Sequence, residues 1–387
     1  MENVTAEASA PPMHEVPLFA DYPAGLLQFA SAFCVLYIVV GIPGNVITIA
    51  ALSRYKKGHN ATAIFIINLS VTDLLLCCFN LPLAASLFIH QAWVHGQALC
   101  VLFPVLRYGL IAVSLFTILA ITINRYVIIG HPDVYNRMYQ PKILALMITA
   151  IWLSAFMFLV PTMSGRWGHF GLDLKIGSCT ILPNADGSSP KDFLFVIAFL
   201  LPAVAFCVCY ARIFLIVRRT ERLARQGPRG GTRPPPASPA AAETSLTVSE
   251  VKASHLEVPE PAGERKPSHG SQLIVTLAST LRDRGSPRAA GSMSAKDKRL
   301  LKMILVIFLS FVLCYLPITI VKVLGKELDA PVINVLGYVL IYLTTCTNPI
   351  IYVAMSSEYR KAYRQLLSCG RRQTALPSAA NRSGSRV

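Results

Sequence analysis

The segment MILVIFLSFVLCYLPITIV, residues 303–321, indicates the fold class because it carries no charged side chain. As a helix, a run of about 20 apolar residues crosses the hydrocarbon core of a bilayer. Six more apolar runs approach or exceed that length, at residues 26–52, 64–89, 101–130, 143–160, 193–217 and 332–354. The sequence therefore predicts an all-α membrane protein, a bundle of seven transmembrane helices.

Composition and charge support this prediction. Apolar residues make up 53% and charged residues 14% of the chain, whereas globular chains have about 25% charged residues. The net charge is +16, and most Lys and Arg residues fall in segments 53–61, 125–142 and 218–302 and in the tail. These segments share one side of the membrane, and the positive-inside rule makes that side cytoplasmic. Lipid headgroups, and no nucleic acid, are the expected partners of this charge.

The spans divide the chain into five parts. Residues 1–24 are an expected extracellular N-terminus with a glycosylation sequon at Asn3, and residues 25–217 hold the first five spans. Residues 218–298 form a long cytoplasmic loop, rich in Pro, Ala, Ser, Gly and Arg, that we expect to be mostly disordered. Residues 299–354 hold the last two spans.

The final part, residues 355–387, combines basic residues with Tyr and Leu and predicts a short amphipathic eighth helix on the inner leaflet. Cys369 follows it directly, where palmitate would reach the membrane. The terminal Ser385-Arg386-Val387 fits the pattern that PDZ domains bind, although a match of three residues also arises by chance.

Two of the ten cysteines, Cys100 and Cys179, face the oxidising side in this topology. The others lie in spans or on the cytosolic side. A disulfide between them is the natural prediction, and two free thiols are the alternative.

Polar residues inside spans are costly, so each is a functional candidate. Asn45, Asp73, Ser114 and Asn348 lie in four different spans. Together they could hold a sodium ion, water or a proton. Interhelical hydrogen bonding is the structural alternative, but a bare carboxylate at Asp73 needs a cation or a proton. No other cofactor is expected.

Landmarks in a fixed order give the chain a resemblance to the rhodopsin-like (class A) family of G-protein-coupled receptors. They are Asp73, Asn124-Arg125-Tyr126, Trp152, Pro202, Cys314-Tyr315-Leu316-Pro317 and Asn348-Pro349-Ile350-Ile351-Tyr352. The stretches 119–126, 165–168, 178–182 and 189–195 are most similar to the insect orphan group that contains Moody and the trapped-in-endoderm receptor.

The resemblance implies a receptor, not an enzyme, at the plasma membrane. It would bind an extracellular ligand and activate a heterotrimeric G protein, with arrestin and a receptor kinase as further partners. The insect group implies a glial or barrier signalling role. The activation switch would comprise the following residues: Asn124, Arg125, Tyr126, Tyr210, Asp297, Pro317, Pro349 and Tyr352.

Two positions depart from the family's usual pattern. Asn124 stands where an aspartate is usual, so the restraint on Arg125 must come from Asp297 or from hydrogen bonding alone. Tyr315 stands where a tryptophan is usual, beneath the ligand pocket. Both changes affect basal activity rather than the fold.

Arg107 is the most informative pocket residue. It lies 18 residues before Arg125 (125 − 107), about five helical turns, so both face the same side of their span. Amine receptors of the family carry an aspartate there, so a cation disfavours amines and favours a carboxylate, a phosphate or a peptide C-terminus. Snorkelling, or pairing with Asp173 or Asp329, is the alternative. Tyr342 completes the expected pocket and replaces the lysine that an opsin needs.

Other functional classes fit poorly. A transporter or channel would show paired inverted repeats and several mid-membrane charges, and an intramembrane enzyme would show a catalytic motif. Neither pattern occurs in the sequence. A constitutively active orphan receptor of another class A group remains an alternative.

Overall fold

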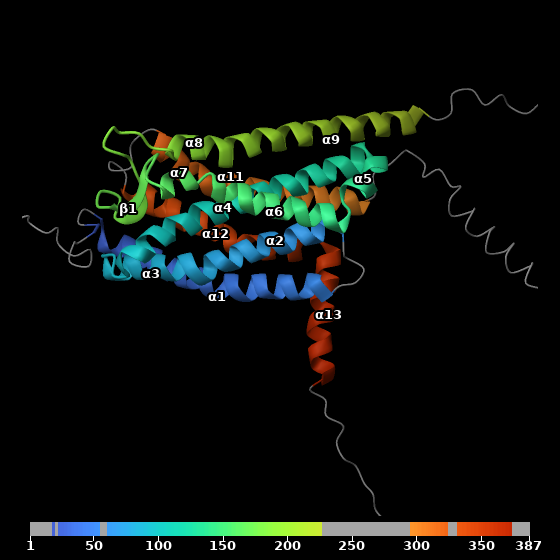
Figure 1. The fold of residues 1–387 in the computed structure, drawn as a ribbon. Coiled ribbons are helices and arrows are strands. Elements are labelled where there is room, and N and C mark those ends of the chain that lie inside the picture. The colour runs from blue at the N-terminus through green and yellow to red at the C-terminus, as the bar shows by residue number, and fades with distance from the viewer. Residues whose placement is uncertain (1–17, 20–21, 55–59, 227–294, 324–330, 374–387) are drawn as a thin grey trace, which may run out of the picture. The chain divides into compact units, whose positions relative to one another are not determined.

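The computed structural model describes residues 18–19, 22–54, 60–226, 295–323 and 331–373. Within these residues seven helical segments are long and apolar enough to cross a membrane, which confirms the predicted class (Figure 1). They are Ala24–Arg54, Ala61–His90, Gly96–Gly130, Pro141–Met163, Leu201–Arg222, Asp297–Ile320 and Val332–Met355.

Sixteen elements build the described chain. The helices are α1 Ala24–Arg54, α2 Ala61–Leu75, α3 Leu81–His90, α4 Gly96–Gly130, α5 Pro132–Met138, α6 Pro141–Met157, α7 Val160–Met163, α8 Lys191–Phe195, α9 Leu201–Gln226, α11 Ala295–Val323, α12 Pro331–Met355 and α13 Ser357–Gln373. Two π-helical turns are η2 Leu76–Asn80 and η3 Val196–Leu200, and the strands are β1 His169–Asp173 and β2 Ser178–Leu182.

The chain divides into two compact units. Met1–Phe214 with Ser294–Val387 forms the helix bundle, and Leu215–Met293 forms the second unit. Of the second unit, only residues 215–226 at the end of α9 are described. The loop predicted to be disordered lies mostly outside the described residues.

Proline explains why the second span is not a regular helix. Pro82 has no N–H to donate, and its ring would clash with the carbonyl four residues earlier. The chain widens by one π-helical turn directly before it, in which the Leu81 N–H bonds to Leu76 O. A second π-helical turn, η3, precedes Pro202 in the same way.

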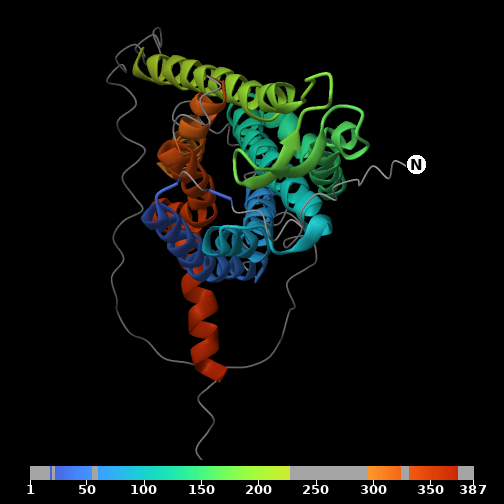
Figure 2. The ribbon, with the colours of Figure 1, turned by 90° about the vertical axis from the view of Figure 1, so that its left-hand side faces the viewer.

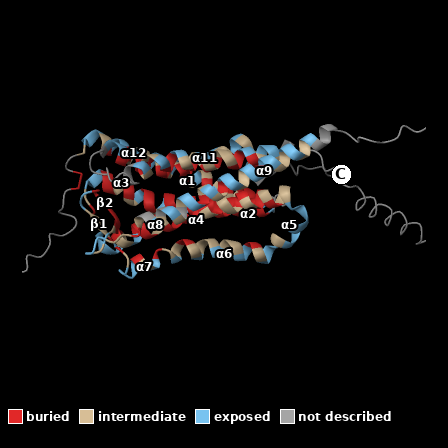
Figure 3. Ribbon diagram, turned by 90° about the horizontal axis from the view of Figure 1, so that it is seen from above, coloured by how far each residue is buried: buried red, intermediate tan, exposed pale blue. Residues whose placement is uncertain are grey.

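Buried positions are concentrated where the helices of the bundle adjoin one another (Figure 3). Many exposed positions carry large apolar side chains. Leu146 and Leu313 are each 67% exposed, and many other large apolar side chains share this outer surface. A soluble domain rarely exposes so much contiguous apolar surface, so lipid is its natural solvent. Inside, α4 contacts α2, α6 and α11.

The two ends of the bundle differ. At one end β1 and β2 form an antiparallel hairpin, with Cys179 opposite Leu172, that lies over the helix ends (Figure 2). The sequence did not predict these strands. At the other end α13 runs crosswise to the bundle and packs on α1 and α12 (Figure 1), which confirms the predicted eighth helix. We call these the disulfide end and the α13 end.

Candidate functional site

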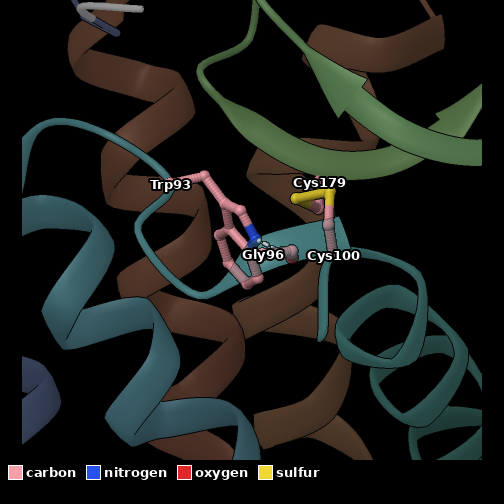
Figure 4. Close-up of a disulfide and its surroundings, with 4 residues drawn as sticks. All are labelled: Trp93, Gly96, Cys100 and Cys179. Atoms are coloured by element: carbon pink, nitrogen blue, oxygen red, sulfur yellow. Dashed lines mark hydrogen bonds between the residues drawn. A yellow bond between two sulfur atoms is a disulfide. The ribbon is translucent and has the colours of Figure 1, made fainter. Parts of the chain in front are cut away.

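Cys100 and Cys179 form the predicted disulfide, with their Cα atoms 5.3 Å apart (Figure 4). The bond ties the start of α4 to β2. Trp93, fully buried beside it, donates from Nε1 to Gly96 O at 2.7 Å and so fixes the turn that leads into α4. A second link joins the Tyr108 and Thr180 hydroxyls at 3.0 Å. The hairpin is therefore held rigidly over the disulfide end.

Arg107 lies beneath this hairpin and is 6% exposed. Its guanidinium carbon lies 4.3 Å from the ring centroid of Tyr338 and 5.7 Å from that of Tyr342. These are cation–π distances. Within the described residues no acidic side chain forms a salt bridge with Arg107. Asp173, an expected partner, instead accepts backbone hydrogen bonds within its own turn, and Asp329 lies outside the described residues.

Arg107 also lines a narrow pocket that is partly open to solvent and has a volume of about 10 Å³, room for roughly one water molecule. Tyr342 lines it too, and the buried Tyr342 hydroxyl has no hydrogen-bond partner in the described part of the chain. Tyr315 does not line this cavity. It is buried, and its ring stacks on Phe311 with centroids 5.7 Å apart. The structure thus joins two of the three predicted pocket residues and adds Tyr338, which sequence reasoning missed.

Of the four residues of the predicted polar cluster, one pair is hydrogen-bonded directly in the described part of the chain. Asn348 donates from Nδ2 to Asp73 Oδ2 at 2.7 Å, and Asn45 donates to Thr345 O at 2.9 Å. Ser114 instead shares a hydrogen bond of 2.9 Å with Thr72, the neighbour of Asp73. Asp73 is 1% exposed, and the described residues give it no cationic partner.

This layer offers oxygen atoms of the kind that a hard cation takes. The buried Oδ1 atoms of Asn45 and Asn348 have no hydrogen-bond partner among the described residues. With the Asp73 carboxylate they supply one negative and two neutral oxygen groups, a chemistry that fits a sodium ion or water. No cluster of three or more acidic, His or Cys ligands occurs in the described part of the chain.

Nearer the α13 end, Arg125 is 5% exposed and donates from Nη2 to the Thr62 hydroxyl. Thr62 in turn donates to Asn124 Oδ1 at 2.8 Å. No acidic residue forms a salt bridge with Arg125 in the residues that the structure describes, Asp297 included. The sequence left two possible restraints on Arg125, an ion pair with Asp297 or hydrogen bonding alone, and the structure shows hydrogen bonding. Thr62 was missed because a threonine in an apolar run carries no signal of its own.

Tyr210, Tyr352 and Tyr126 are the tyrosines of the predicted switch. Tyr210 donates to Leu301 O at 2.8 Å and so links α9 to α11. Tyr352 is buried with an unpartnered hydroxyl among the described residues, and its ring meets Tyr359 of α13 edge-on. Tyr126 bonds instead to His131 at 3.3 Å on the exposed side. Pro317 and Pro349 lie within α11 and α12.

A short hydrogen bond links α13, the predicted eighth helix, to α1. Thr48 donates to Gly44 O at 2.7 Å, which leaves its oxygen to accept from the Tyr363 hydroxyl at 2.5 Å. Burial raises the pKa of Tyr363, so this hydroxyl keeps its proton. Arg360 donates to Val353 O and Ala354 O and so caps α12.

Sequence comparison gives this architecture a family. Residues 44–352 match the 7 transmembrane receptor (rhodopsin family). The chain belongs to this family of receptors. The resemblance predicted from sequence is confirmed, and so is the prediction that the chain is no enzyme.

Three relatives and one solved structure illustrate the likeness. G-protein coupled receptor moody of Drosophila melanogaster is 40% identical over 92% of this chain and 53% of its own length. Protein trapped in endoderm-1 of the same fly is 32% identical over 90% of this chain and 79% of its own length. G-protein coupled receptor 84 of Homo sapiens is 25% identical over 92% of this chain and 96% of its own length. Squid rhodopsin shares the fold, with a TM-score of 0.65 and 20% identity over 92% of this chain and 89% of its own.

The chain spans about half the length of the moody receptors, 53% and 54% in two Drosophila species.

Proposed function

We propose that this chain is a plasma-membrane receptor that binds an acidic ligand at the disulfide end and activates a heterotrimeric G protein at the α13 end. The single observation that carries the ligand class is Arg107, a buried cation in a cavity with no acidic partner among the described residues. An unpaired buried charge is costly unless a counter-charge joins it. A carboxylate or phosphate would supply that charge through paired N–H···O bonds.

The receptor would do no covalent chemistry. Ligand binding would favour one of two conformations, and the movement would release Arg125 from Thr62 and open a cavity for the G protein. The buried Arg125 Nε has no partner in the described residues, so this guanidinium keeps a free donor.

Purified receptor and G protein would test the ligand class. Carboxylic and phosphoric acids, each paired with its neutral amide or alcohol, would be screened for accelerated nucleotide exchange, with each G-protein class supplied in turn. We expect responses to acids alone, lost in Arg107→Gln and partly kept in Arg107→Lys. Arg166→Gln removes an exposed arginine and is the matched control. Activation by neutral partners, or acid responses that survive Arg107→Gln, would contradict the proposal.

A receptor that signals without ligand is the second candidate. It is favoured by the hydrogen-bonded Arg125, which lacks the carboxylate that the family usually places beside it. Ligand-free nucleotide exchange at matched receptor amounts would test it, and exchange no faster than G protein alone would exclude it.

Further parts of the proposal rest on sequence. The Lys and Arg distribution supports a cytoplasmic α13 end and an external N-terminus. Cys369 lies near the end of α13 and is proposed to carry palmitate. Asn3, proposed to be glycosylated, and residues 385–387, proposed to bind a PDZ domain, lie outside the described residues. Arrestin and receptor-kinase partners, and glial or barrier signalling, rest on the family resemblance.

A further inference from the structure

Two residues that precede the first span are buried against the bundle. Leu18 is 2% and Phe19 is 8% exposed. The Leu18 N–H donates to Gln91 O at 2.8 Å, and the Phe19 ring lies 5.8 Å from that of Phe88 at the end of α3. The Phe19 backbone is left-handed, with φ 66°, a conformation that residues with a Cβ rarely adopt.

Other elements enclose the Phe19 ring. A Cβ added to Gly177, in the hairpin turn, would lie 2.6 Å from the ring, so this close approach requires glycine. On another side the Tyr22 ring meets Phe19 edge-on at 5.1 Å. The Tyr22 hydroxyl accepts from Asn334 of α12 at 3.3 Å. The hairpin, α3 and α12 therefore all contribute to the position of Phe19.

Phe19 lines the same cavity as Arg107. The other apolar lining residues are Ala84, Leu87, Phe88, Phe103, Ile176 and Val335. Arg107 is the one cationic side chain among the residues that line this cavity. The remaining lining residues are polar and neutral: Ser178, Asn334, Tyr338 and Tyr342. The cavity thus combines a single positive charge with a wall of seven apolar and four neutral polar side chains.

We propose that Phe19 is a specificity-determining residue of this cavity, and that the cavity takes an acid with one negative charge and an apolar body. The inference rests on the proposed function and narrows its ligand class. A small hydrophilic anion could pair with Arg107 but would leave the seven apolar side chains of the wall without a partner. A dianion would bring a second charge for which the lining has no second cation. An apolar body would instead pack against Phe19 and Phe88, whose rings it would displace because the pocket itself has little free volume.

The substitution Val335→Cys makes access to the cavity measurable without the natural ligand. The full-length receptor carrying Val335→Cys would be treated with the anionic reagent 2-sulfonatoethyl methanethiosulfonate, and its modification rate corrected for that of the native cysteines. Adding Phe19→Ala should raise the rate about tenfold, because reaction follows the fraction of molecules in which the wall is open. Phe19→Leu should stay near the parent rate. Phe29→Ala is the matched control, since Phe29 is 42% exposed on α1.

Protection from the reagent then tests selectivity. The probe is 4-phenylbutyrate, with succinate and inorganic phosphate as hydrophilic anions. Protection by 4-phenylbutyrate alone, weakened several-fold by Phe19→Ala and kept by Phe19→Leu, would support the inference. Equal protection by the hydrophilic anions would overturn it. A modification rate and a protection pattern unchanged in Phe19→Ala would also overturn it.

Arg107→Gln separates this inference from the proposed function. Protection by 4-phenylbutyrate and by its neutral amide would be measured in the parent and in the Arg107→Gln receptor. If the acid protects no better than the amide, and equally well in both receptors, the acidic-ligand proposal fails. A Phe19 effect on the modification rate would remain measurable in that case. If Arg107 is required and Phe19 is not, only the further inference fails.

Discussion

Replacing Thr62 by valine should raise ligand-free signalling. Thr62→Val keeps the size of the side chain but removes the hydroxyl that accepts from Arg125 and donates to Asn124. Both hydrogen bonds are buried, and this arrangement is the one proposed for the resting receptor. Their loss should destabilise the resting conformation more than the active one, in which Arg125 is free of Thr62.

The size of the effect follows from the charged donor. A hydrogen bond to a charged group contributes about 1.5–3 kcal/mol. At ~2 kcal/mol the active-to-inactive ratio changes about 30-fold, since 1.4 kcal/mol corresponds to a factor of ten. If about 1% of receptors are active at rest, then about a tenth to a quarter would be active in the variant, for a ten- to 30-fold change.

Basal nucleotide exchange per surface receptor is the assay. Thr62→Ser keeps the hydroxyl and should stay near the parent rate. Thr149→Val makes the same chemical change at an exposed position on α6 and controls for loss of a threonine. Asp297→Ala should have a smaller effect than Thr62→Val, because no salt bridge joins Asp297 to Arg125 in the described residues.

One pattern of results would refute this reasoning. If Thr62→Val signals like the parent while Asp297→Ala raises basal exchange, then an ion pair restrains Arg125 and the Thr62 hydrogen bond is incidental.

Three further predictions can be tested by substitution. Cys100→Ala and Cys179→Ala should each reduce surface delivery, because a crosslink across a separation of 79 residues stabilises a fold by about 3–5 kcal/mol. The double change should be no worse than either, and additive losses would argue against a shared bond. Asp73→Asn should abolish any fall of agonist affinity with rising sodium, and a response that survives it would exclude the site. Asn124→Asp should lower basal exchange by giving Arg125 a carboxylate, and an unchanged or higher rate would count against electrostatic restraint.

Much of the fold could be predicted because a bilayer constrains the sequence strongly. Every backbone polar group must be satisfied within the membrane, so seven apolar runs mean seven helices. The Cys100–Cys179 pair followed from topology, and the Asp73–Asn348 contact joins two costly polar residues that both need partners. In each case the chemistry of the residue is itself unusual for its place.

The features that were missed depend on packing between segments far apart in the chain. Thr62 and Trp93 are ordinary residues until the rotation of α2 and the path into α4 place them beside Arg125 and the disulfide. Phe19 precedes the first span, and only the hairpin turn at Gly177 makes it part of a cavity. The strands His169–Asp173 and Ser178–Leu182 are short, and they are stabilised by the disulfide and by contacts with α4.

Three charged side chains are buried in the bundle, and within the described residues none of them forms a salt bridge: Arg107, Asp73 and Arg125. Tyrosine rings, an asparagine amide and a threonine hydroxyl stand in for counter-ions. Such partners contribute less than an ion pair does, so each charge can still take a stronger partner. That partner would be an acid at Arg107, a cation at Asp73 and a G protein at Arg125. Since α4 carries both arginines and contacts α2, which carries Asp73, a change at one layer can shift the stability of the next. That shared helix is the physical basis on which we expect ligand and G protein to influence each other's binding.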